Sequence, residues 1–181
     1  FGNIILADEI NRAPAKVQSA MLEAMEEKQV TVAGETHKLP KLFMVMATQN
    51  PIEQEGTFPL SEAQKDRFLM HVHVGYVDME SEFQMVKMVQ AEKRREKESH
   101  AKIPQTLIFA AQDEVAQMPV SDALGHYMIE LVFCTRYPLR YSRQLEVMIE
   151  LGVSPRASLA LNKCAKAHAW LKGKTQVDIE D

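Results

Sequence analysis

The stretch Ile4-Ile5-Leu6-Ala7-Asp8-Glu9 is an apolar run that ends in two adjacent carboxylates. A short continuous apolar run is typical of a strand buried in a parallel sheet. Ligands of such sheets bind beyond the carboxyl ends of the strands, which is where both acids lie. Because successive side chains of a strand point to opposite faces, we expect Asp8 and Glu9 to have different tasks.

These two acids suit the chemistry of a nucleoside triphosphatase. Asp8 could hold a Mg²⁺ ion through its water shell, and Glu9 could orient or deprotonate an attacking water. A solvated strand end would give the same string of residues, so the string alone leaves both interpretations open.

A second apolar run, residues 42–48, predicts another buried strand, parallel to the first. It is followed by Gln49-Asn50-Pro51, where the proline turns the chain out of the sheet. If the two strands are neighbours, Asn50 lies beside Asp8 and Glu9, and its amide could hold both a phosphate oxygen and a water. An ordinary asparagine in a turn before proline is the alternative.

Two arginines are further candidates. Arg156 falls in the first turn of a helix opened by Ser154-Pro155, where a cation opposes the helix dipole. An anion between the two would explain it, and that anion could be a phosphate or a local acid. Arg67 follows Asp66, and taken alone it is most simply a solvated surface cation.

The remaining segments predict an α/β part followed by a helical part. Up to Val77 we expect a helix that begins at Pro14, with one apolar face formed by Val17, Met21, Leu22 and Met25. We expect a β-hairpin next, in which residues 29–32 and 36–39 are the strands and residues 33–35 the turn. A short helix at 61–68 and a third strand at 71–77 complete this part. From Asp78 onward we expect only helices and connecting segments. The helices are predicted at 79–89, from Ser121, at 142–150 and from Ser154 to near Gly173, with the first turn of another helix at 177–181. Residues 92–98 are predicted to be a solvated run of charges, and residues 103–109 an irregular segment.

Composition narrows the class of protein. The chain has 181 residues, of which 46% are hydrophobic and 25% charged, as in ordinary globular proteins. No run approaches the ~18 apolar residues that span a bilayer, and the net charge of −4 does not favour nucleic-acid binding. Two cysteines and the lack of an export signal suit the cytoplasm. The histidines show no spacing typical of a zinc site, although His71 and His73 could form a pair of ligands.

The two ends of the sequence indicate a piece of a longer protein. The chain begins without methionine, at Phe1-Gly2, and enters a strand directly. A complete chain that has lost its initiator methionine is the alternative.

Several motifs together resemble the MoxR family of AAA+ ATPases. They are Leu6–Pro14 with Gln18–Glu27, Gln29–Val32, Ala47–Thr57, Glu62–Gln64 with Asp66–Phe68, and Ser154–Ser158. The resemblance implies the C-terminal part of a AAA+ P-loop core, residues 1–77, and an all-helical lid domain, residues 78–181.

The resemblance also implies roles for individual residues. Asp8 and Glu9 look like the Walker B pair, with Asp8 on Mg²⁺ and Glu9 as the catalytic glutamate. Asn50 resembles sensor 1, Arg156 resembles sensor 2, and Arg67 resembles an arginine finger that reaches the ATP of a neighbouring subunit. The hairpin resembles the insertion that precedes sensor 1. Family members are generally hexameric, chaperone-like ATPases, often acting with von Willebrand factor A domain proteins.

One departure from the family pattern matters for activity. The motif G-x-x-x-x-G-K-[ST] does not occur in the chain, and in this family it precedes Walker B. Without its lysine and backbone amides the phosphates have no cradle, so we predict that the chain alone binds ATP weakly and does not hydrolyse it. Ala15, Ser61 and Lys65 depart from the pattern without touching the proposed chemistry. A degenerate AAA+ scaffold and a carboxylate-based metal hydrolase using Asp8 and Glu9 are the alternatives.

Overall fold

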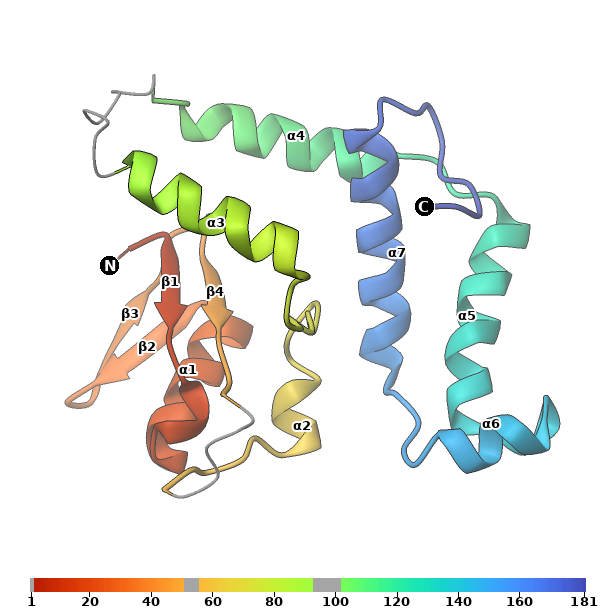
Figure 1. Ribbon diagram of the computed structural model, residues 1–181, viewed down its shortest axis with the longest axis horizontal. Coiled ribbons are helices and arrows are strands. Elements are labelled where there is room, and N and C mark those ends of the chain that lie inside the picture. Colours follow the sequence, from red (N-terminus) through yellow and green to blue (C-terminus); the bar gives the residue numbers. More distant parts are fainter. Residues whose placement is uncertain (1, 51–55, 93–101) are drawn as a thin grey trace. The chain divides into compact units, whose positions relative to one another are not determined.

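The computed structural model describes residues 2–50, 56–92 and 102–181 (Figure 1). Pro51–Glu55 of the predicted sensor 1 motif and residues 93–98 of the charge run therefore lie outside the described residues. The chain forms two compact units: one combines residues 1–69 with 134–157, and the other combines 70–133 with 158–181. These units interleave along the chain, whereas the resemblance implies a sequential division at residue 77, which stays a prediction.

The sheet of the first unit carries the two predicted parallel strands. Strands β1 (Ile4–Ala7) and β4 (Met44–Ala47) pair in parallel, with Ile4 opposite Met44 and Ala7 opposite Ala47 (Figure 1). The expectation of fully buried strands is wrong for this structure, since Ile4 and Leu6 are 61% and 65% exposed. Alternate side chains of both strands share one exposed face, and the others are half-buried.

Helix α1 (Ala15–Glu27) follows Pro14, as predicted. Its buried side differs from the predicted apolar face. Val17 is 51% exposed, whereas Gln18 is buried together with Leu22 and Ala24. The helix ends at Lys28, which has a left-handed backbone, and β2 begins directly after it.

The predicted hairpin is present with a tighter turn. Strands β2 (Gln29–Val32) and β3 (Glu35–Lys38) are antiparallel, so Glu35 belongs to the second strand rather than the turn. Ala33 and Gly34 both have positive φ, at 52° and 87°. A two-residue turn with this backbone matches the twist of the flanking strands.

The remainder of the segment before Met70 contains α2 (Glu62–Lys65), which is shorter than predicted. Ser61 and Gln64 form a reciprocal capping box at its start. The predicted strand at 71–77 is wrong, because these residues are exposed and make no ladder. Their alternating pattern would need a partner strand and a covered face, and the described residues supply neither.

The first unit also includes a later segment of the chain. It contains the short 3₁₀ helix η2 (Pro138–Arg140) and helix α6 (Arg143–Met148), where Ser142 caps α6 by accepting from the Gln144 N–H at 3.1 Å. Further along, the Val153 N–H donates to Thr135 Oγ1 at 3.2 Å, and Arg136 Nε donates to the Val153 carbonyl at 2.7 Å. These two bonds hold Val153 against Thr135 and Arg136.

The second unit is helical. It contains α3 (Met79–Glu92), α4 (Gln105–Gln117) and most of α5 (Asp122–Arg136) and α7 (Pro155–Leu171). The prediction of an irregular segment at 103–109 is wrong, because α4 begins at Gln105. Pro104, which has an extended backbone, is the N-cap of this helix. Proline fits at a helix start, where its missing N–H leaves no intrahelical bond unmade.

Helices α5 and α7 and the segments after α4 and α7 contribute to one apolar core. Its buried members are Met118, Met128, Ala165, Ala169 and Val177. Trp170 packs against this core and donates its indole N–H to a Glu114 carboxylate oxygen at 2.8 Å. Helix α7 is followed by Gly173 with φ 70°, and residues 179–180 form a turn, closed by a bond from the Asp181 N–H to the Asp178 carbonyl, where the sequence predicts the first turn of another helix.

At the acidic end of the chain, Lys174 lies between two carboxylates. Its ammonium donates to Asp181 at 2.8 Å and to Asp178 at 2.9 Å, and the bond from Lys174 is the largest cause that lowers the pKa of Asp181 to about 2. Among the residues that the structure describes, no helix is long and apolar enough to cross a membrane.

Gly152 provides a test of the packing in the first unit. A Cβ atom at this position would lie 2.7 Å from Arg136 Cα and 2.8 Å from the Thr135 carbonyl oxygen. Gly152→Ala should therefore lower the free energy of unfolding by about 1–3 kcal/mol, measured by urea denaturation. Gly125→Ala is the matched control, because a Cβ at this position in the first turn of α5 (Asp122–Arg136) meets nothing within 4 Å. It should raise the free energy of unfolding by about 0.5–1 kcal/mol, and equal effects of the two substitutions would contradict the packing argument.

Candidate functional site

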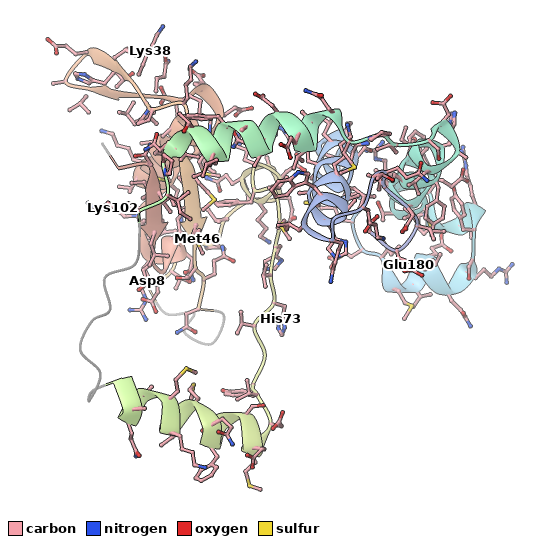
Figure 2. The ribbon with its side chains drawn as sticks, turned by 90° about the horizontal axis from the view of Figure 1, so that it is seen from above. Asp8, Lys38, Met46, His73, Lys102 and Glu180 are labelled. Atoms are coloured by element: carbon pink, nitrogen blue, oxygen red, sulfur yellow. The ribbon has the colours of Figure 1, made fainter. Side chains whose placement is uncertain are left out.

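A polar edge follows β1 and β4 where their ladder ends. Thr48 Oγ1 donates to Asp8 Oδ1 at 2.6 Å and accepts from the Glu9 backbone N–H at 2.8 Å. A hydroxyl has one proton and two lone pairs, so it satisfies both groups at once. The ladder continues through Thr48, whose carbonyl accepts from the Ile10 N–H at 2.9 Å. Figure 2 shows Asp8 at the carboxyl end of β1, where sequence analysis places it.

Glu9 has a left-handed backbone, with φ 47° and ψ 54°. This conformation is uncommon for a residue with a side chain, and it turns the chain from β1 into the 3₁₀ helix η1 (Ile10–Arg12). The Glu9 carboxylate accepts from Arg12 Nε at 2.7 Å. The negative charge of Glu9 thus lies beside a local cation, and the side chains of Glu9 and Arg12 are 36% and 47% exposed.

Asn50 lies at the same edge through its backbone. Its carbonyl accepts from Asn11 Nδ2 at 3.4 Å, two residues beyond Glu9. Asn11 is buried, and within the described part of the chain its Oδ1 atom has no hydrogen-bond partner. This bond brings the Asn50 backbone to the segment that follows the two acids, and the place of the Asn50 side chain beside Asp8 and Glu9 stays a prediction.

Gln18 ties this edge to its surroundings. The side chain is 1% exposed, and its Nε2 atom lies 3.2 Å from the Ile10 carbonyl oxygen, 3.1 Å from that of Ala13 and 2.7 Å from that of Phe58. The Phe58 N–H in turn donates to the Asn11 carbonyl at 2.6 Å. One buried amide thus links α1, the loop after β1 and the segment before α2.

A second cluster joins the two candidate arginines. Arg67 Nε donates to Glu26 Oε2 at 2.8 Å, and Arg156 Nη2 donates to Glu26 Oε1 at 2.6 Å. The pKa of the Glu26 carboxyl is lowered, chiefly by the hydrogen bond from Arg67 and further by both positive charges. Of the two anions that could explain Arg156, the structure shows the local acid.

Asp66 and Ser154 complete this cluster. The Ser154 hydroxyl lies 2.6 Å and 2.7 Å from the two carboxylate oxygens of Asp66, and it also accepts from the Arg156 backbone N–H at 3.0 Å. Arg156 Nη1 approaches Asp66 at 3.4 Å. Ser154 therefore caps the start of α7 while holding it to the residue next to Arg67.

The structure brings the candidate residues into two groups. Asp8, Glu9 and Asn50 share the polar edge, and Arg67 and Arg156 share Glu26. Among the described residues, no hydrogen bond or ion pair joins one group to the other. Sequence reasoning missed Thr48, Gln18 and Glu26 as partners. The position of Thr48 directly after an apolar strand was a usable signal, whereas nothing local marks Glu26 among the acids of α1.

The donor set of the polar edge fits a hydrated Mg²⁺ ion. Mg²⁺ prefers oxygen ligands and usually keeps several waters, so one or two carboxylates are enough. Asp8 is exposed, and only its Oδ1 atom is engaged by Thr48. Within the described ranges, no group of three or more His, Cys, Asp or Glu side chains could hold a metal by itself.

Two protein-family profiles match the chain. The ATPase family associated with various cellular activities (AAA) matches residues 1–70, and the AAA lid domain matches residues 143–181. The chaperone MoxR1 of Mycobacterium tuberculosis is 41% identical over 180 residues, which are 99% of this chain and 47% of that protein. This chain belongs to the MoxR family of AAA+ ATPases.

Other relatives agree with this assignment. The uncharacterized protein YeaC of Bacillus subtilis is 43% identical over all of this MoxR-family chain and 54% of its own length. A crystal structure of a candidate ATPase from Cytophaga hutchinsonii superimposes with a TM-score of 0.88 at 45% identity, over 99% of this chain and 55% of that one. The MoxR-family chain thus spans about half the length of the relatives it matches, and its fold is the predicted AAA+ core segment with a helical lid.

Gln18 is the residue to test for the polar edge. Gln18→Leu would keep the side-chain volume but remove the donor that Gln18 supplies to the carbonyls of Ala13 and Phe58, while the Ile10 carbonyl would keep its bond from the Ala13 N–H. We expect the free energy of unfolding to fall by about 1–3 kcal/mol, measured by urea denaturation. Gln112→Leu, on the exposed side of α4, is the control and should change it little. Similar values for both variants would mean that the buried amide has no special role.

Proposed function

We propose that this MoxR-family chain is part of an ATP-hydrolysing, chaperone-like ATPase that couples ATP binding and hydrolysis to the remodelling or maturation of partner proteins. The observation that carries the proposal is the carboxylate pair Asp8–Glu9 at the end of β1, bound to Thr48 at the end of β4. Because the chain spans about half of its relatives, the activity belongs to a longer protein that also supplies a phosphate-binding loop.

In this proposal the polar edge binds the hydrated Mg²⁺ ion and activates the attacking water. Bound Mg²⁺ would neutralise charge on the phosphates of ATP. Asp8 would hold the waters around this ion, while Thr48 orients its carboxylate. Glu9 would accept a proton from the attacking water, which requires that its carboxylate part from Arg12. Asn50 would orient that water or a phosphate oxygen through its side-chain amide.

The arginine cluster would respond to the nucleotide. Arg67 would act as an arginine finger on the ATP of a neighbouring subunit, and Arg156 would act as sensor 2 from the start of α7. Both side chains are partly exposed, at 32% and 48%, so a phosphate can reach them. Guanidinium groups suit this role because they remain charged and bind phosphate through several N–H groups.

The partners follow from the family rather than from this chain's contacts. We propose a homo-oligomeric, hexameric ring, because an arginine finger acts across a subunit interface. A von Willebrand factor A domain protein or another client is the proposed partner, and the cytoplasm is the proposed location. MoxR1, the relative from Mycobacterium tuberculosis, carries the name of a chaperone, which supports the remodelling role.

Glu9→Gln tests the centre of the proposal in the full-length protein. The amide keeps the size of the side chain but cannot accept the proton, so kcat should fall by about 10²–10⁴-fold. ATP binding should persist, measured with a fluorescent ATP analogue. Glu23→Gln, an exposed acid of α1, should leave turnover unchanged. Parental turnover in Glu9→Gln would remove Glu9 from the chemistry, whereas a parent protein that binds ATP without turning it over would favour the scaffold alternative.

Arg67→Ala tests whether the active site is shared between subunits. We expect turnover to fall by about 10³-fold or more, with nucleotide binding retained. Mixing Arg67→Ala subunits with Glu9→Gln subunits should restore part of the activity, because some interfaces then combine an intact Glu9 with an intact Arg67. Lys65→Ala removes a neighbouring cation that pairs within α2 and serves as the control. A mixture no more active than its components would argue against action across the interface.

A further inference from the structure

The Glu26 carboxylate bridges two arginines that come from distant parts of the chain. Arg67 follows α2 and Arg156 lies in the first turn of α7, and each takes a different oxygen of Glu26. Because neither oxygen is shared, both bonds keep short distances, 2.8 Å and 2.6 Å. One carboxylate therefore holds two guanidinium groups side by side.

The two guanidinium groups keep donors for another anion. Arg67 uses Nε on Glu26 and Nη1 on the Ala63 carbonyl, at 3.0 Å. Arg156 uses Nη2 on Glu26 and Nη1 on Asp66. In the part of the chain that the structure describes, neither Nη2 of Arg67 nor Nε of Arg156 makes a hydrogen bond. A guanidinium has five N–H donors, so both groups could bind a phosphate while remaining on Glu26.

Charge explains why this pair needs a carboxylate. Two guanidinium groups this close together repel each other, and an anion between them offsets that repulsion. Glu26 supplies that anion, and Asp66 adds a second negative charge beside Arg156, so the four side chains sum to zero. An isolated exposed ion pair adds little to stability, and the value of this arrangement is that it fixes the direction of both arginines.

We propose that Glu26 is a positioning residue that holds Arg67 and Arg156 together as one phosphate-binding pair. This inference rests on the proposed function, because it takes both arginines to act on nucleotide phosphate. Without Glu26 the side chains of Arg67 and Arg156 would separate, and both would have to be repositioned on the phosphate in every turnover. Misplacement of a positioned group by about 1 Å can lower the rate as much as 10²-fold.

Glu26→Gln in the full-length protein separates the two bonds. A glutamine has a single acceptor oxygen, and its NH₂ group would face one of the arginines, so one guanidinium loses its partner. Glu27→Gln is the matched control, one residue further along α1, where the Glu27 carboxylate accepts from Gln29 Nε2 at 2.9 Å and from no other residue that the structure describes. Glu26→Asp keeps the charge but is one methylene shorter, and it serves as a second variant if Glu26→Gln folds poorly.

Two measurements decide the proposal. The first is the rate at which phenylglyoxal modifies Arg67 and Arg156 in the nucleotide-free protein, followed by peptide mass spectrometry. The second is kcat and KM for ATP. For Glu26→Gln we expect faster modification of at least one arginine and a kcat about tenfold lower, while Glu27→Gln matches the parent in both.

The outcomes also separate this inference from the proposed function. Unchanged modification rates in Glu26→Gln would overturn the proposal, and so would faster modification with parental kcat while Arg67→Ala and Arg156→Ala are inactive. If Arg67→Ala and Arg156→Ala themselves keep parental turnover, the proposed nucleotide roles have failed, and the positioning role fails with them.

Discussion

The register of the β1–β4 ladder determines where the polar groups of the site lie. Ala7 lies opposite Ala47, so Asp8 and Thr48 leave the sheet together, and the Thr48 hydroxyl can bind both the Asp8 carboxylate and the Glu9 N–H. A slip by one residue would turn these side chains to the opposite face. The buried amide of Gln18 then holds the segment after β1 beside the segment before α2, because it is bound to the carbonyls of Ile10 and Phe58.

The two halves of the site share one electrostatic design. In each, a group proposed to act on the nucleotide is paired with an opposite charge from its own chain: Glu9 with Arg12, and Arg67 and Arg156 with Glu26. These pairs are partly exposed, so water screens them and an incoming phosphate or water can replace them at modest cost. Glu9, Arg67 and Arg156 are thus positioned by ion pairs that an incoming ligand can break.

Local patterns in the sequence predicted the parallel strands, the hairpin and most helices, since each depends on short-range periodicity and caps. They failed where the outcome depended on a distant partner. The alternation at 71–77 suits a strand, yet within residues 2–50, 56–92 and 102–181 no strand pairs with it. Gln18 breaks the apolar face of α1 because it serves three backbone carbonyls. Glu26 and Arg156 are 130 residues apart, a separation that no local pattern can bridge. The roles of the five candidate residues remain predictions from the family resemblance.

The left-handed backbone of Glu9 has a consequence for the evolution of this protein. A side chain in this conformation costs about 1 kcal/mol relative to glycine, so glycine at this position would relieve the strain at φ 47°. Selection for heat resistance alone would then favour loss of the very carboxylate proposed to act on water. A library screened for thermal tolerance without an activity screen should accumulate glycine at position 9.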